Sequence, residues 1–84
     1  MSKNLREEIY KIIEKEWPVH ETTIAKKLGM KTDGKNQKKA VARVHYHIKM
    51  LKEQEKIVTK NVGGSLLIWP HEIEKLRFIH EMLR

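Results

Sequence analysis

The sequence of 84 residues predicts a mainly α-helical domain with one small β-hairpin. Two observations favour this fold class. Apolar residues recur at intervals of three and four over residues 37–54, which is typical of an amphipathic helix. Two β-branched and apolar segments, 57–62 and 65–69, flank Gly63-Gly64, a dipeptide that tolerates the positive φ angles of a tight hairpin turn. The sequence thus predicts a helix followed directly by a hairpin.

Capping signals and apolar spacing predict two helices before this segment. Asn4 with Glu7 three residues later indicates a helix N-terminus, and helical spacing continues until Pro18 ends the run. A short extended segment is expected at Val19. A second helix of two to three turns follows over ETTIAKKLG, with Gly29 as its left-handed C-cap.

The third helix is predicted to have one apolar and one basic side. It follows an exposed loop at residues 30–36, which contains the breaker pair Asp33-Gly34 and has no apolar periodicity. The buried stripe consists of Val41, Val44, Ile48 and Leu51. The opposite side carries Lys35, Lys38, Lys39, Ala42, Tyr46 and Lys49, with Arg43 and His45 at its flanks.

The net charge of +7 arises in the middle of the chain. Residues 26–60 contain 11 Lys and Arg against 3 Asp and Glu, whereas the segments on either side are almost neutral. This distribution indicates a face that binds a polyanion, because each cation that neutralises a phosphate releases condensed counterions. A solvated, lysine-rich surface is the alternative.

Residues 71–84 are expected to form a C-terminal helix within a single domain that spans residues 1–84. This helix follows Pro70 and is apolar over more of its circumference than a surface helix normally is. A symmetric partner would cover such a patch, so we expect a homodimer. The expected dimer interface consists of Ile73, Leu76, Phe78, Ile79 and Leu83. Alternatively, the helix packs wholly against its own subunit.

Several function classes are not expected from this sequence. There is no cysteine, His45 and His47 lie about 200° apart on a helix, and no H-E-x-x-H spacing occurs, so no metal site is expected. The sequence has no nucleophile motif or phosphate-binding glycine loop, and we expect no enzyme activity, cofactor or small-molecule ligand. No apolar run approaches the roughly 20 residues of a membrane helix. We expect a cytoplasmic, nucleoid-associated protein.

The order helix, helix, basic helix, hairpin, helix resembles the winged helix-turn-helix domain of ArsR- and MarR-like transcription regulators of prokaryotes and archaea. Three segments carry the resemblance over essentially the whole chain: PVHETTIAKKLGM resembles the second helix, VHYHIKMLKEQEKI the recognition helix, and VTKNVGGSLLIW the wing. The chain departs from the family at Glu55, where Gly is usual, and in its longer link between the second and third helices. The resemblance implies a small regulator that binds double-stranded DNA.

Residue roles follow from the position of such a helix in the major groove. The groove-facing set is Gln37, Lys38, Ala42, Arg43 and Tyr46, with Arg43 expected to pair with guanine and Gln37 with adenine. Phosphate contacts are expected from Lys35, Lys39, Lys49, Lys60 and Asn61, and from Thr22, Thr23 and Lys26 on the second helix. A protein-interaction module and an architectural DNA or RNA binder remain the alternatives.

Overall fold

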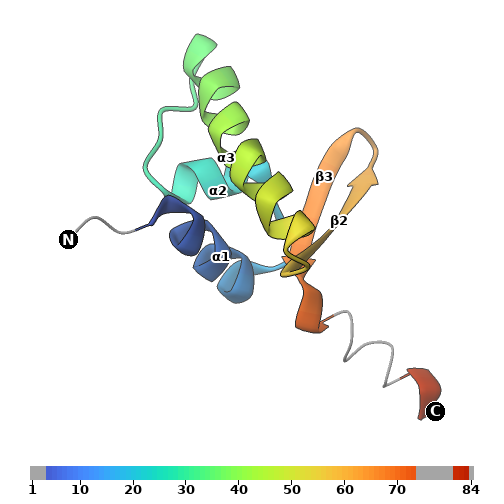
Figure 1. Cartoon of the computed structure of the whole chain (residues 1–84). Coiled ribbons are helices and arrows are strands. Elements are labelled where there is room, and N and C mark those ends of the chain that lie inside the picture. Colours follow the sequence, from blue (N-terminus) through green and yellow to red (C-terminus); the bar gives the residue numbers. More distant parts are fainter. Residues whose placement is uncertain (1–3, 74–80, 84) are drawn as a thin grey trace.

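Three helices pack beside a three-stranded antiparallel sheet in the computed structural model, which describes residues 4–73 and 81–83 (Figure 1). The helices are α1 (Leu5–Glu16), α2 (Glu21–Lys27) and α3 (Lys35–Glu53). The strands are β1 (Val19–His20), β2 (Ile57–Val62) and β3 (Ser65–Pro70), in the order β1-β3-β2. The fold is therefore mixed α/β. The expected hairpin is confirmed, and β1 adds a third strand to it.

Local sequence signals fix the start of α1 and the turn of the hairpin. The Asn4 side chain accepts a hydrogen bond of 2.9 Å from the backbone N–H of Arg6, which satisfies one of the free donors of the first turn. Gly63 and Gly64 both have positive φ, at 57° and 83°, as a two-residue turn of the predicted kind requires. Both signals were predicted from the sequence and are confirmed.

The C-terminus of α2 closes in a Schellman motif. Gly29 has φ 78°, its N–H donates to the Lys26 carbonyl at 3.0 Å, and the N–H of Met30 donates to the Ala25 carbonyl at 3.1 Å. Both bonds satisfy carbonyls that the helix itself leaves free. The predicted left-handed cap at Gly29 is confirmed.

The C-terminus of α3 closes in the same motif without a glycine. The N–H of Glu55 donates to the Lys52 carbonyl, and the N–H of Lys56 donates to the Leu51 carbonyl, both at 3.0 Å. Glu55 consequently has φ 58°, a region in which its Cβ is crowded by the following carbonyl oxygen. This turn directs the chain from α3 into β2.

The core lies between the three helices and one face of the sheet. Its buried apolar residues are Ile9, Ile13, Val19, Ile24, Ala25, Ala40, Val44, Ile48, Leu51, Ile57 and Ile68. The predicted stripe of α3 is confirmed at Val44, Ile48 and Leu51, whereas Val41 is only half-buried and Ala40 takes its place in the core.

Two predicted boundaries differ from the structure. α3 begins at Lys35 rather than at residue 37. β3 runs one residue beyond the predicted 65–69 and ends at Pro70, which is buried and lies opposite Ile57, and helix follows it at residues 71–73 as predicted. The missing N–H of Pro70 removes no ladder bond to β1, because β1 pairs only with Leu67 and Ile68.

The predicted C-terminal helix lies largely outside the described residues. Residues 71–73 and 81–82 are helical, and the intervening residues 74–80 are not described. Within the described part of the chain, no helix combines the length and apolarity needed to cross a membrane.

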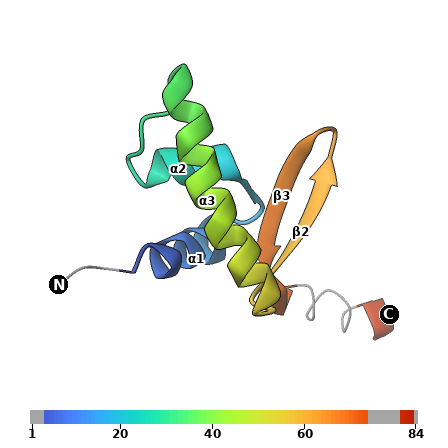
Figure 2. The same ribbon diagram turned by 45° about the horizontal axis from the view of Figure 1, so that its top comes forward.

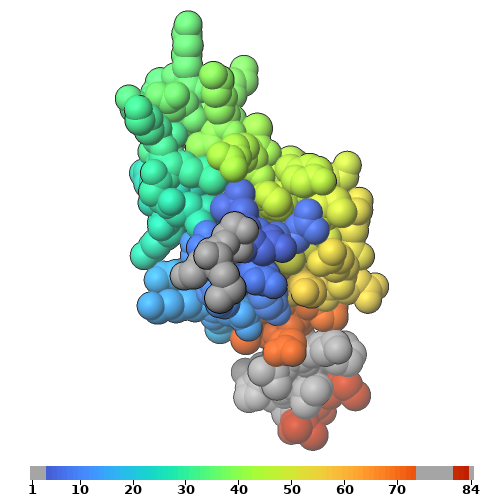
Figure 3. Space-filling model, turned by 60° about the vertical axis from the view of Figure 1, so that its left-hand side comes forward, coloured from blue at the N-terminus to red at the C-terminus, as the bar shows by residue number. Residues whose placement is uncertain are grey.

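Two parts of the molecule extend to the same side. The N-terminal half of α3 and the tip of the β2-β3 hairpin both project away from α1, as two views of the ribbon show (Figures 1 and 2). The space-filling view shows the loop after α2 and the first turns of α3 forming a prominence above α1 (Figure 3). These projecting parts contain most of the residues that the sequence predicts to bind DNA.

Candidate nucleic-acid interface

The solvent-facing side of α3 is basic over almost its whole length. The exposed residues of α3 include Lys35, Gln37, Lys38, Lys39, Ala42, Arg43, Tyr46 and Lys49, all of which are predicted from the sequence to bind DNA. Tyr46 is 57% exposed. The first turn contains no acidic residue, and Glu53 at the C-terminal end is the only acid in the helix. The structure thus brings this part of the expected site together on one element.

These residues are nevertheless distributed around the helix. At 100° per residue, Lys38, Ala42 and Lys49 lie on the flank of His45, whereas Lys39 and Arg43 lie on the opposite flank. Gln37 lies two turns before Val44, and therefore on the side of the buried stripe. It is exposed because the buried residues of α3 begin only at Ala40, one turn further along the helix. The expected groove-facing set is therefore divided, because Gln37 lies on a different side of α3 from Ala42 and Tyr46.

The hairpin places Lys60 and Asn61 on opposite faces of the sheet, because successive side chains alternate along a strand. Asn61 shares a face with buried Ile57, which is the face toward the helices. Lys60 lies on the other face and lines a largely apolar hollow of about 340 Å³. Both residues are exposed, but only Asn61 lies on the face turned toward the helices.

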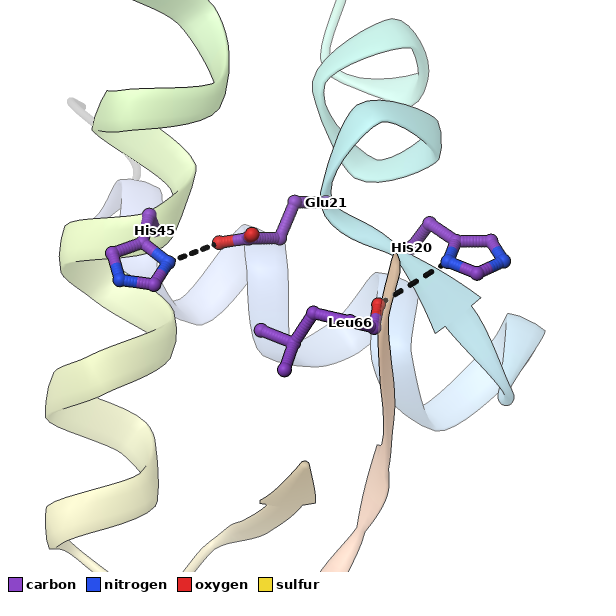
Figure 4. A network of polar contacts seen from close by, with 4 residues as sticks. All are labelled: His20, Glu21, His45 and Leu66. Carbon is purple, nitrogen blue, oxygen red and sulfur yellow. Dashed lines mark hydrogen bonds and ion pairs between the residues drawn. The ribbon is translucent and has the colours of Figure 1, made fainter. Parts of the chain in front are cut away.

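The start of α2 adds a carboxylate to this region. The side chain of Glu21 is only 14% exposed, and its Oε2 accepts a hydrogen bond of 2.7 Å from Nδ1 of His45 on α3 (Figure 4). Its neighbours Thr22 and Thr23 are half-buried, and Lys26 is exposed. The sequence did not predict Glu21 as part of this site. It lies 24 residues from His45 in the chain, and no local pattern connects the two residues.

A second histidine links β1 to β3. Nδ1 of His20 donates to the carbonyl oxygen of Leu66 at 3.2 Å, so the residue that precedes α2 is tied to the central strand (Figure 4). His20 pairs with Leu67 in the same sheet. The start of α2, and with it Glu21, is therefore held in a fixed position relative to the hairpin.

A cluster of three side chains joins α1 to α3. Nε of Arg6 donates to Nδ1 of His47 at 3.2 Å, and the Arg6 guanidinium lies 6.0 Å from the centre of the Tyr46 ring. The Tyr46 and His47 rings meet edge to face at 5.3 Å. Burial lowers the pKa of His47 below its usual 6.5, and the charges of Arg6 and Arg43 lower it further. The neutral imidazole is thereby kept as an acceptor for Arg6.

The expected dimer residues are described only in part. Ile73 is half-buried and lines the apolar hollow of the sheet together with Trp17 and Val62. Leu83 is 81% exposed, and its neighbour Met82 is 71% exposed. Leu76, Phe78 and Ile79 lie outside the described residues.

Comparisons with known proteins add no family to this description. No family model matches the chain, and the searches of curated proteins and of solved structures yield no significant match. Any functional proposal therefore rests on the arrangement of charges and surfaces in this chain.

Proposed function

We propose that this protein binds double-stranded DNA through a winged helix-turn-helix arrangement and acts as a small transcription regulator. The observation that carries the proposal is the solvent-facing side of α3, where exposed cations accumulate over more than four turns without an acid before Glu53. A basic face of this kind is suited to binding a polyanion. A protein-interaction module would present an apolar or mixed face instead. The major groove of B-form DNA has the width of one such helix.

Shape supports this proposal as well as charge. α3 and the tip of the hairpin project to the same side of the molecule, so one ligand surface is accessible to both (Figure 2). In the proposed complex α3 lies in the major groove, and Lys38, Ala42 and Lys49 face the bases and the nearer phosphates. Asn61 is the hairpin residue best placed to reach the adjacent backbone.

The proposed regulator acts as a homodimer through its C-terminal segment. The support for this part of the proposal is the exposure of Met82 and Leu83 together with the apolar hollow beside Ile73. Apolar side chains of this size gain about 1.5–3 kcal/mol each when they are fully removed from water. A two-fold dimer would also place two copies of α3 on one side of a duplex.

The test is a salt-titrated binding assay on duplex DNA, single-stranded DNA and duplex RNA. We expect the wild type to prefer duplex DNA, and its log affinity to fall linearly with log salt. The triple variant Lys38→Ala, Lys39→Ala, Arg43→Ala should reduce this slope by about 0.9 for each phosphate that its side chains no longer neutralise. The matched control is Lys11→Ala, Lys15→Ala, Lys27→Ala, which removes the same charge from exposed positions outside α3.

The assay also separates the alternatives. An equal decrease of affinity in the two triple variants would mean that only net charge matters, and would favour an architectural, sequence-independent binder. A wild type that ignores duplex DNA at low salt would refute the proposal. The protein-interaction hypothesis would then be favoured, with the hollow lined by Trp17, Val62 and Leu67 as its first candidate surface.

A further inference from the structure

A shallow basic hollow lies beside the N-terminal half of α3, on the flank away from Glu21 and His45. Its volume is about 310 Å³. The loop after α2 forms one wall and α3 the other, and the lining residues are Met30, Lys31, Asn36, Lys39, Ala40 and Arg43. Half-buried Met30 and buried Ala40 supply the apolar part of the lining, and the other four residues supply its polar groups.

The polar groups of this hollow favour an anion. Three of the six lining residues are cations: Lys31 lies on the loop wall, and Lys39 and Arg43 lie on the α3 wall. None of the six is a carboxylic acid. The nearest acid in sequence, Asp33, accepts a hydrogen bond of 3.3 Å from the side-chain amide of Asn36 and forms no ion pair with a lysine within the described part of the chain. The three positive charges that line the hollow repel one another, and an anion bound between them would offset this repulsion.

The backbone fixes the walls in place. The N–H of Met30 is bonded to the Ala25 carbonyl at the end of α2, and the N–H of Asn36 is bonded to the Asp33 carbonyl at 2.9 Å. Lys39 and Arg43 are four residues apart and therefore project from the same side of α3. The hollow is thus built from two anchored segments rather than from a single run of surface lysines.

We propose that this hollow binds one phosphate group of the nucleic-acid backbone. The inference rests on the proposed DNA binding. It adds Lys31 to the DNA-binding residues, although Lys31 lies outside α3 and outside the β2-β3 hairpin. It also assigns Arg43 to the backbone, where its guanidinium forms two parallel hydrogen bonds with phosphate oxygens, rather than to a guanine base. A phosphodiester and a free phosphate share this chemistry, and the test distinguishes them.

The first arm of the test is charge reversal at Lys31. Lys31 is exposed, and no hydrogen bond or ion pair of its side chain occurs among residues 4–73 and 81–83, so Lys31→Glu should leave the fold intact. Removal of one phosphate contact should lower the log–log salt slope on duplex DNA by about 0.9. Lys15→Glu, in the last turn of α1, makes the same charge change away from the hollow and should leave the slope unchanged. Equal slopes for Lys31→Glu and Lys15→Glu would overturn the proposal.

The second arm keeps the inference separate from DNA binding itself. Inorganic phosphate is titrated into the protein while backbone amide shifts are recorded by NMR. If the wild type does not bind duplex DNA, saturable shifts confined to Lys31, Asn36, Lys39 and Arg43, and absent in Lys31→Glu, would support a site for a free phosphate-containing ligand. Shifts that are absent, or that are spread over all lysines, would then overturn the hollow as a phosphate site.

Discussion

Replacing Glu55 by glycine is expected to stabilise the protein, although it removes a side chain. Glu55 occupies the left-handed position of the Schellman motif that ends α3, with φ 58°. The equivalent position of α2 is Gly29, so one chain contains the same turn with and without the steric penalty. The Glu55 side chain is exposed and forms no hydrogen bond or ion pair among the described residues that would offset that penalty.

The magnitude follows from two opposing terms. The left-handed conformation costs a non-glycine residue roughly 1–2 kcal/mol, and glycine loses roughly 0.5–1 kcal/mol more backbone entropy on folding. The net gain for Glu55→Gly therefore lies in the range of about 0–1.5 kcal/mol, with a central value of about 0.75 kcal/mol. In a domain of 60–100 residues, 1 kcal/mol shifts the melting temperature by roughly 4–8 °C, so the central value corresponds to a rise of roughly 3–6 °C.

The assay is thermal and urea unfolding followed by circular dichroism, with two controls. Glu55→Ala removes the carboxylate but keeps the Cβ, and should give little of the gain. Glu53→Gly introduces glycine at the last residue of α3, where φ is right-handed, and should destabilise the protein by up to about 1 kcal/mol. If Glu55→Ala raised stability as much as Glu55→Gly, the effect would come from the charge and the backbone argument would be refuted.

Four further outcomes are expected. Ile68→Ala should cost about 2–5 kcal/mol in chemical denaturation, because this fully buried side chain of the central strand leaves a cavity, and a cost below about 1 kcal/mol would contradict the packing described. Arg6→Gln should raise the pKa of His47 toward 6.5 in an NMR titration. Because the folded pKa of His47 is depressed, its contribution to stability is present above pH 6.5 and is lost as the pH falls through the folded value, so Arg6→Gln should reduce that loss. Glu21→Gln should tighten DNA binding about twofold for each phosphate that lies roughly 10 Å from the carboxylate, and unchanged affinity would place the DNA elsewhere. Leu83→Glu should shift sedimentation toward monomer, whereas an unchanged distribution would exclude this residue from a dimer interface.

Local chemistry made most of the fold predictable. The Asn4 cap, the Gly29 cap and the Gly63-Gly64 turn each act within a few residues, and each was identified from the sequence and is present in the structure. The second strand of the hairpin was predicted to end at Trp69, one residue early, because proline is equally compatible with the start of a helix and with the end of a strand. The choice between them depends on the register of β3 against β2, a long-range property.

The candidate site was predictable only where it lies on one helix. The period of α3 identified the exposed positions of Lys38, Ala42 and Tyr46, because that property is local. The contact between Glu21 and His45 and the basic hollow beside Lys31 each join separate elements, so no spacing in the sequence announces them. The placement of Lys60 and Asn61 on opposite faces of the hairpin could also have been predicted from the sequence, because side chains alternate between the two faces along a strand.

The N-terminus of α3 has a consequence for how the helix opens. Gly34 precedes it without a side-chain cap, and its first residues, Lys35 and Lys38 among them, are exposed and basic at the end where the backbone dipole is already positive. Ala40 marks the point at which the core begins to hold the helix. Amide hydrogen exchange should therefore be fast before Ala40 and slow from Val44 onward. An anion bound beside these first turns would offset their unfavourable charge and slow that exchange, so ligand binding and completion of the helix would be thermodynamically coupled.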